Sequence, residues 1–296
     1  MTEISSSPGA FARSADHHAA DTAAARPNVL RCGACGGTVA FQIGQGLAAC
    51  VFCGSPALKP ETDTRPDTEL SPRRSVPFEV CHADADRVYR EAARSSWFRP
   101  AALRAAQVEM RSIFVPAWLV GARVETHLTG LVSAASPSGK APVAVRDVQP
   151  LDELIPASGA LDVPELAALR PFRIERATPW DAEDASHPFE LPGCSEERAR
   201  ARAHERMAAR HAASLAQARD ISRSQSSSIL LDSNAELVML PVHICAIRFR
   251  NRAWRFLVNA STGELVGKLP WDRVKIAGVV AATLAVCLAF SIIVNA

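Results

Sequence analysis

The chain has 296 residues, 22% of them charged, and a formal net charge of +2. This balance excludes a general electrostatic attraction to nucleic acid or to an anionic membrane, although it rules out neither as a partner. The length suffices for one medium-sized domain and smaller pieces. Residues 1–27, rich in Ala, Ser, Asp and His without periodicity, predict a disordered tail that holds no secretory signal.

Four cysteines near the N-terminus form the strongest motif of the sequence. The spacing Cys32-x2-Cys35-x14-Cys50-x2-Cys53, with each pair in a Gly-rich turn, is typical of tetrahedral zinc bound by four thiolates. Sulfur then fills every coordination position, so a structural Zn²⁺ is predicted and a catalytic one is not. A redox Cys-x-x-Cys pair is the alternative. Residues 28–58 are therefore a predicted small β zinc ribbon, whose metal supplies its folding free energy.

The middle of the chain predicts an α+β domain. Residues 59–76 are a polar, Pro-containing linker, and residues 77–271 combine helical and β-like patterns. Ser195 is a predicted N-cap, with Glu196 and Glu197 in the first turn of a long helix. Helices are expected at 83–95, 101–108 and 196–219, and strands at 112–119, 126–132, 237–248 and 253–258.

Two windows of this domain resemble each other. Phe114–Leu119 and Met239–Ile244 both follow the pattern apolar, apolar, Pro, apolar, ring, apolar. Proline within a strand is confined to an edge, a start or a bulge, so the two windows share an unusual local requirement. They raise the hypothesis of a duplicated half-domain.

Basic residues recur in two stretches. Arg198, Arg202, Arg206 and Arg210 repeat every four residues along the long helix, which favours a solvated face over a ligand surface. Between residues 248 and 255, arginines alternate with other residues, which favours a strand edge protected by charge. Binding of anionic lipid or RNA by this stretch is the alternative.

Signatures of known enzyme classes are missing from the sequence. It contains neither a phosphate-binding G-x-x-x-x-G-K-[ST] loop nor a G-x-S-x-G nucleophile elbow, and His204-Glu205 is not followed by the second histidine of H-E-x-x-H. The acids Asp152 and Glu153 have no base paired with them in the sequence. We therefore predict that the protein is not an enzyme, with an unrecognised site in the α+β domain as the alternative.

The C-terminal segment is strongly apolar. Residues 276–294 carry no charge and would be about 28 Å long as a helix, close to the ~30 Å hydrocarbon core of a bilayer. They predict a single transmembrane helix and the lipid bilayer as a partner. Lys268, Arg273 and Lys275 precede the segment, so the body is expected in the cytoplasm, at the bacterial inner (plasma) membrane. Scattered remaining cysteines, which form no disulfide framework, agree with a reducing compartment.

The same tail helix is a candidate dimerisation surface. Ala277, Ala281, Ala285 and Ala289 recur every four residues and would line one helix face. Small residues at this spacing allow two helices to approach closely in lipid, which predicts a homodimer through the tail. The general abundance of alanine in the chain is an equally good explanation.

These features together resemble a bacterial family of zinc-ribbon membrane proteins of uncharacterised function, often mislabelled as relatives of primosomal protein N′ or of helicases. The resemblance covers about residues 29–271 and rests on the ribbon and on Val76–Phe78, Trp97–Pro100, Val115–Trp118, Leu151–Ser158, Arg255–Asn259 and Thr262-Gly263. The chain departs from the family pattern at Gly33, Ala117, His243 and Ala260. The resemblance implies an architecture and no known activity, and the missing phosphate-binding loop contradicts the helicase label.

We therefore expect a tail-anchored, cytoplasm-facing zinc-ribbon protein that acts as a protein-binding or scaffold module at the membrane, with an unidentified protein partner. The alternative is a membrane-held nucleic-acid-binding protein that uses its Arg-rich surfaces. Nucleic acid is the less favoured partner, because Arg31 is the one charged side chain of the ribbon between Asn28 and Leu58.

Overall fold

The computed structural model describes residues 28–41, 47–61, 71–134, 139–161, 163–182, 185–249, 252–267 and 269–295. The strands are β1 (Asn28–Cys32), β2 (Thr38–Phe41), β3 (Leu58–Pro60), β4 (Arg74–Ser75), β5 (Glu109–Ser133), β6 (Lys140–Pro156), β7 (Thr178–Pro179), β8 (Phe189–Glu190), β9 (Ser222–Phe249), β10 (Arg252–Asn259) and β11 (Leu265–Gly267). The α-helices are α1 (His82–Arg94), α2 (Val163–Ala168), α3 (Glu196–Ala218) and α4 (Arg273–Asn295), with short 3₁₀ helices η2 (Ala101–Ala105) and η3 (Ile174–Arg176).

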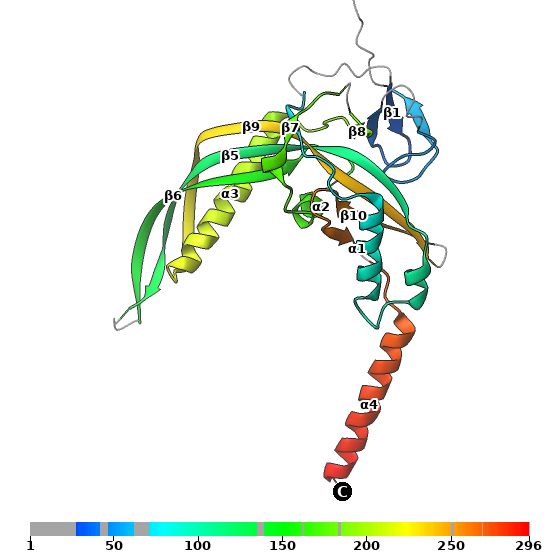
Figure 1. The fold of residues 1–296 in the computed structure, drawn as a ribbon. Helices are drawn as coiled ribbons and strands as arrows, with labels where there is room; N and C mark the ends of the chain where they lie inside the picture. The colour runs from blue at the N-terminus through cyan, green and yellow to red at the C-terminus, as the bar shows by residue number, and fades with distance from the viewer. Residues whose placement is uncertain are drawn as a thin grey trace, which may run out of the picture.

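One mixed sheet organises the molecule. Within the described residues it has 11 strands, in the order β11-β10-β9-β5-β8-β2-β1-β3, with β6 paired to β5, and β4 paired to β9 and β7. The long strands β5 and β9 pair antiparallel, from Glu109 opposite Ala246 to Leu131 opposite Ser222. Together with β6 they extend as a curved arm, along which α3 lies (Figure 1).

Helix α3 forms where its caps and apolar spacing predict it. The Ser195 hydroxyl accepts a hydrogen bond from the backbone N–H of Arg198, and Glu196 and Glu197 occupy the first turn. Every fourth residue of the helix is buried against the arm. These buried residues are Ala199, Ala203, Met207, His211 and Leu215.

Helix α1 covers the other end of the same sheet. Its buried face includes Tyr89, whose ring stacks on Phe256 of β10 with centroids 5.0 Å apart. The Tyr89 hydroxyl donates a hydrogen bond of 2.7 Å to the carbonyl of Leu103, which satisfies the polar end of a fully buried side chain.

The two similar windows of the sequence lie side by side at the centre of the sheet. Phe114 pairs with Pro241 and Pro116 pairs with Met239, so an approximate two-fold axis relates the windows. Each proline sits where its strand changes neighbours, from β8 to β6 for Pro116 and from β4 to β10 for Pro241. No N–H donor is needed at such a changeover, which explains why proline is tolerated inside a strand.

Equivalent contacts surround both windows. The carbonyl of Pro116 accepts from the N–H of Ala157 at 3.0 Å, and that of Pro241 accepts from Ala260 at 3.1 Å. A Pro-Phe-Glu sequence also occurs before each of the two helices, at residues 77–79 before α1 and at residues 188–190 before α3. The structure therefore supports the duplicated half-domain.

The aromatic positions of the windows are equivalent as well. The indole N–H of Trp118 donates to the carbonyl of Cys194, at 2.8 Å. His243 Nε2 contacts the carbonyl of Val80 at 2.7 Å. Each ring thus ties its strand to the segment that leads into a helix, α3 in one half and α1 in the other.

The prediction of a transmembrane helix at the C-terminus is wrong. Helix α4 (Arg273–Asn295) occupies the segment in which that helix was expected. Among the described residues, none of the helices combines the length and apolarity needed to cross a membrane.

The strands of the ribbon belong to the main sheet. Strand β2 pairs with β8 through Val39 opposite Glu190 and Ala40 opposite Phe189, and β8 in turn pairs with β5. Three short strands cannot bury a core of their own. Val51 and Phe52 of the ribbon therefore pack into the core of the body.

Candidate metal centre

The first cysteine pair lies in a tight turn held by backbone hydrogen bonds. The N–H of Cys32 donates to the carbonyl of Gly37, and the N–H of Gly36 donates to the carbonyl of Cys32, both at 2.9 Å. Gly36 has φ = 75°, a left-handed conformation that favours glycine. This turn brings Cys32 and Cys35 onto the same side.

The second pair repeats the same geometry. The N–H of Cys50 donates to the carbonyl of Ser55, and the N–H of Gly54 donates to the carbonyl of Cys50, again at 2.9 Å. Gly54 has φ = 74° and occupies the position equivalent to Gly36. Two matching turns of this kind are what a tetrahedral thiolate site requires.

The four sulfur atoms converge. All of them lie within 4.8 Å of one another, and the Sγ atoms of Cys32 and Cys53, and of Cys35 and Cys50, are 3.7 Å apart. Zn–S bonds of about 2.3 Å in a tetrahedron place sulfur atoms about 3.8 Å apart. The predicted ligands Cys32, Cys35, Cys50 and Cys53 thus form a cluster that could hold a metal ion, and its spacing is compatible with zinc.

The thiols of the cluster differ in acidity. Burial raises the pKa of Cys35 to about 12 and also raises that of Cys50. Burial acts in the same direction on Cys32, but backbone hydrogen bonds from Cys35 and Ala34 outweigh it and lower its pKa to about 7. A metal ion binds thiolates, so binding releases protons and weakens as the pH falls.

The body contacts the ribbon at the turn that carries the second cysteine pair. The Arg111 side chain of β5 donates through Nη1 to the carbonyl of Cys50, at 2.9 Å. Within the ribbon, Phe52 of the second turn packs against Gly37 of the first: a Cβ added at Gly37 would lie 2.7 Å from the Phe52 ring. Cys32 and Cys50 are buried in the same apolar cluster as Ile113 of β5, so the metal ligands are part of the main core.

A buried carboxyl group lies at the seam between ribbon and body. Glu190 of β8 is 1% exposed, and its Oε1 accepts from the N–H of Gly159 at 2.9 Å. Its Oε2 has no hydrogen-bond partner among the described residues. Burial raises the pKa of Glu190 to about 7, although hydrogen bonds from Ser158, Gly159 and Ala160 act in the opposite direction.

The other residues singled out in the sequence are distributed over the body. Arg198 and Arg202 are exposed, as predicted, whereas Arg206 and Arg210 reach Glu153, which the sequence left without a partner. The His204 ring contacts the carbonyl of Ser228. The side chains of Arg248, Arg250 and Arg252 lie outside the described residues.

Sequence reasoning missed a hydrogen-bonded chain of polar side chains. The Ser112 hydroxyl lies 2.6 Å from His82 Nε2 and 2.9 Å from His243 Nδ1. Burial lowers the pKa of His243, which keeps the ring neutral. These residues come from α1, β5 and β9, and no local spacing in the sequence relates them.

No family model, no curated protein and no solved structure matches this chain.

We predict that the protein binds about one zinc per chain and that Cys50→Ser abolishes this binding. A closed thiolate site contributes an apparent ~10–16 kcal/mol, comparable to the whole stability of a domain. Because Cys50 is buried in the main core, the variant should also lower the melting temperature of the body. Elemental analysis of the purified protein and calorimetry measure both effects.

Cys287→Ser is the matched control, since Cys287 is exposed on α4 and outside the cluster. It should retain zinc and melt like the parent. Retention of zinc by Cys50→Ser, or equal loss in both variants, would contradict the assignment.

Glu190→Gln should stabilise the protein above pH 7 and leave it unchanged near pH 4. The unfolded carboxyl ionises from about pH 4.5, whereas the folded one resists ionisation until about pH 7. The unfolded state therefore binds fewer protons in this window, and the free energy of unfolding falls by about 3 kcal/mol as the pH rises through it. Urea unfolding at pH 5 and pH 8 should show this fall in the parent and lack it in the variant.

Glu79→Gln is the control for this experiment, because Glu79 holds the equivalent position in the other half-domain but pairs with Arg173 and Arg176. It should not stabilise the protein at pH 8. A parent and a Glu190→Gln variant with parallel pH profiles would refute the buried-carboxyl account.

Proposed function

We propose that the protein is a non-enzymatic, metal-stabilised module that binds an extended segment of a partner protein at the membrane. The observation that carries this proposal is an open strand edge beside the ribbon. The closed thiolate set supports it, because four sulfur ligands leave no position at which a metal could activate water.

Strand β5 has a partner on only one side at its beginning. From Glu109 to Ile113 it pairs with β9, and its other edge gains a described strand partner only at Phe114, where β8 begins. The N–H of Phe114 donates to Pro188 on that outer side. Backbone direction alternates along a strand, so Ser112 and Met110 also present their N–H and C=O groups outward. Such an edge accepts an additional strand from a partner.

A groove of about 350 Å³ lies over this edge. The ribbon contributes an apolar wall, and β5 contributes the ion pair of Glu109 with Arg111. Its lining residues are Leu47, Ala48, Ala49, Val51, Glu109, Arg111, Ser112 and Pro188. Backbone pairing would supply affinity, while this wall would select alternate small apolar side chains of the bound segment.

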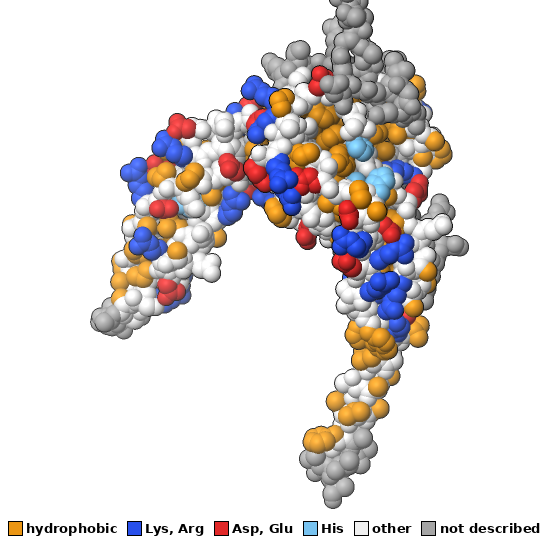
Figure 2. All heavy atoms as spheres, in the orientation of Figure 1, with side chains coloured by type: hydrophobic (Ala, Val, Ile, Leu, Met, Phe, Trp, Pro, Cys, Tyr) orange, Lys and Arg blue, Asp and Glu red, His pale blue; other side chains and the backbone are white. Residues whose placement is uncertain are grey.

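Helix α4 supports a location at the membrane, on the cytoplasmic side of the bacterial inner membrane. It projects from the body (Figure 1), and Figure 2 shows apolar side chains along it below a zone of Lys and Arg. Trp97 and Trp271 are 62% and 53% exposed at its base, where the Lys275 amine lies 5.2 Å from the Trp97 ring. Exposed Trp and cationic residues together favour the headgroup region of a bilayer. A second copy of α4 is the alternative partner for the exposed apolar side chains of this helix.

Nucleic-acid binding is supported less well, because many described arginines already form ion pairs within the protein. Phosphate binding requires basic side chains that are available in number. Pairs with acidic residues include Arg74 with Glu236, Arg90 with Asp86, Arg146 with Glu125, Arg176 with Glu79, and Arg255 with Glu165.

The groove is tested by blocking it. With benzoylphenylalanine in place of Glu109, illumination in native membranes should yield a discrete crosslinked protein. Adding Ala48→Glu should reduce that product about tenfold, because the longer, charged side chain takes the space of the bound segment and must be desolvated against it. Ala48 is exposed in the groove, so the substitution leaves the fold intact.

Ala34→Glu serves as the matched control, since Ala34 is an exposed alanine of the ribbon outside the groove. It should leave crosslinking unchanged. The proposal fails if the chain with Ala48→Glu crosslinks as well as the chain without it. It also fails if benzoylphenylalanine at position 109 yields no crosslinked product in native membranes.

The role of α4 is tested separately. A chain that ends at Trp271 should no longer sediment with native membranes, whereas the full chain should, because the exposed apolar residues of α4 are then missing. Quantitative blotting of both fractions measures the effect. Equal membrane retention of the two chains would show that another surface makes the contact.

A further inference from the structure

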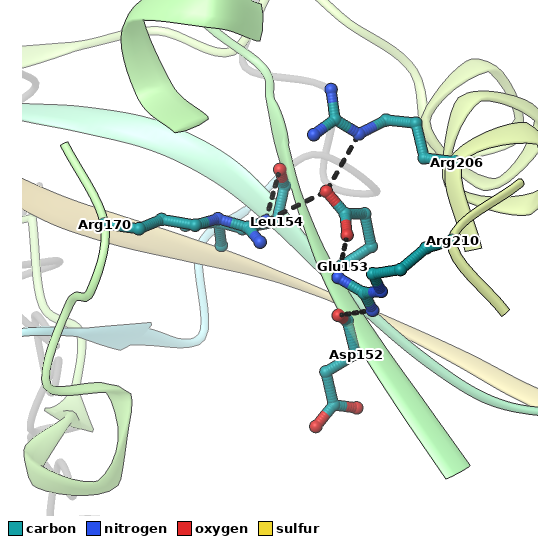
Figure 3. A network of polar contacts seen from close by, with 6 residues as sticks. All are labelled: Asp152, Glu153, Leu154, Arg170, Arg206 and Arg210. Atoms are coloured by element: carbon teal, nitrogen blue, oxygen red, sulfur yellow. Dashed lines mark hydrogen bonds and ion pairs between the residues drawn. The ribbon is translucent and has the colours of Figure 1, made fainter. Parts of the chain in front are cut away.

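A buried glutamate near the end of β6 contacts three arginines from two other segments of the chain (Figure 3). Glu153 has a side chain that is 2% exposed. Its Oε1 accepts from Arg206 Nε at 2.9 Å and from Arg170 Nη2 at 3.1 Å, and its Oε2 accepts from Arg210 Nη1 at 2.8 Å. Arg206 and Arg210 come from α3, whereas Arg170 follows α2.

The charges of this group do not balance. Three guanidinium groups and one carboxylate leave an excess of two positive charges. Asp152 does not correct the excess, because Arg210 contacts its backbone carbonyl and its carboxylate points away from the group (Figure 3). Burial lowers the pKa of Arg170, Glu153 opposes that shift, and the charges of Arg206 and Arg210 reinforce it.

Donors of the group remain available. Arg170 Nε is buried and has no hydrogen-bond partner among the residues that the structure describes. Arg206 uses Nε toward Glu153, so its two terminal nitrogens stay out of that contact (Figure 3). The arginine side chains are 29–44% exposed, and β6 is an edge strand paired with β5, so the group as a whole can be reached from solvent, although Arg170 Nε itself is buried.

The fold itself does not require this charged group. In the duplicated half, Leu257–Ser261 corresponds to Leu154–Ser158, so the position of Glu153 is taken by Phe256. Phe256 is buried and stacks on Tyr89 of α1. Apolar packing therefore suffices to hold a helix against the sheet at this position, and buried ion pairs are often no more stabilising than such packing.

We propose that Arg170, Arg206 and Arg210 form a binding site for a small phosphate dianion, either inorganic phosphate or a phosphate monoester. Two negative charges match the excess of the group, and guanidinium forks match phosphate oxygens in geometry. Glu153 is a positioning residue, which holds the three guanidinium groups close together without contacting the ligand.

Calorimetric titration of the zinc-loaded full chain at low ionic strength tests the site, with inorganic phosphate and glycerol 3-phosphate as separate probes. Saturable binding of one phosphate per chain is expected, and the tighter probe identifies a free ion or an ester as the ligand. Arg206→Gln should weaken binding about tenfold, because it removes a charged hydrogen-bond donor.

Arg202→Gln is the control, since Arg202 is exposed one turn earlier on α3 and should bind phosphate like the parent. Glu153→Gln should tighten binding, because the excess rises to three charges; a purely structural ion pair would not produce this gain. Absence of saturable binding of both probes, equal weakening in Arg202→Gln and Arg206→Gln, or weaker binding in a folded Glu153→Gln variant would overturn the proposal.

Discussion

The antiparallel pairing of β5 with β9 is the interaction on which the rest of the structure depends. It joins segments far apart in the sequence, and it carries the two Pro-containing windows at its centre. Helix α3 and β6 are attached to one end, α1 and β10 to the other, and the ribbon is attached through β8. Such a sheet forms only when strands far apart in the sequence pair in the right register, so its folding depends on long-range contacts.

The duplication shows which features belong to the scaffold and which are additions. Both halves use a proline at a change of strand neighbour and a ring that reaches the carbonyl before a helix, through Trp118 and His243. The additions differ between the halves. One half carries Glu153 with its arginines, whereas the other carries the stacked pair of Tyr89 and Phe256. Features that break the approximate symmetry are the better candidates for function.

The metal ligands were predictable because their geometry is local. Two residues between paired cysteines, followed by a glycine able to adopt positive φ, determine the turn without help from the rest of the chain. Helix α3 was predictable for the same reason, since Ser195 and the acidic first turn are neighbours in sequence.

Most of the long arm and the charged group were not predictable. Residues 222–236 are rich in serine and lack clear alternation, so only pairing with β5 makes them a strand. The contacts of Glu153 require three separate segments to meet. The C-terminal error has another origin: composition alone identified an apolar segment, whereas none of the helices in the described part of the chain has the length and apolarity needed to cross a membrane.

The central claim is that the thiolate cluster is a structural part of the main sheet. Hydrogen exchange of the backbone amides, measured by mass spectrometry with zinc and after chelation, tests it most directly. The account predicts faster exchange after chelation in β1 and β2, and also in β8 and in Ile113–Val115 of β5, since Cys32, Cys50 and Ile113 share one core. Acceleration confined to residues 28–60 would contradict it.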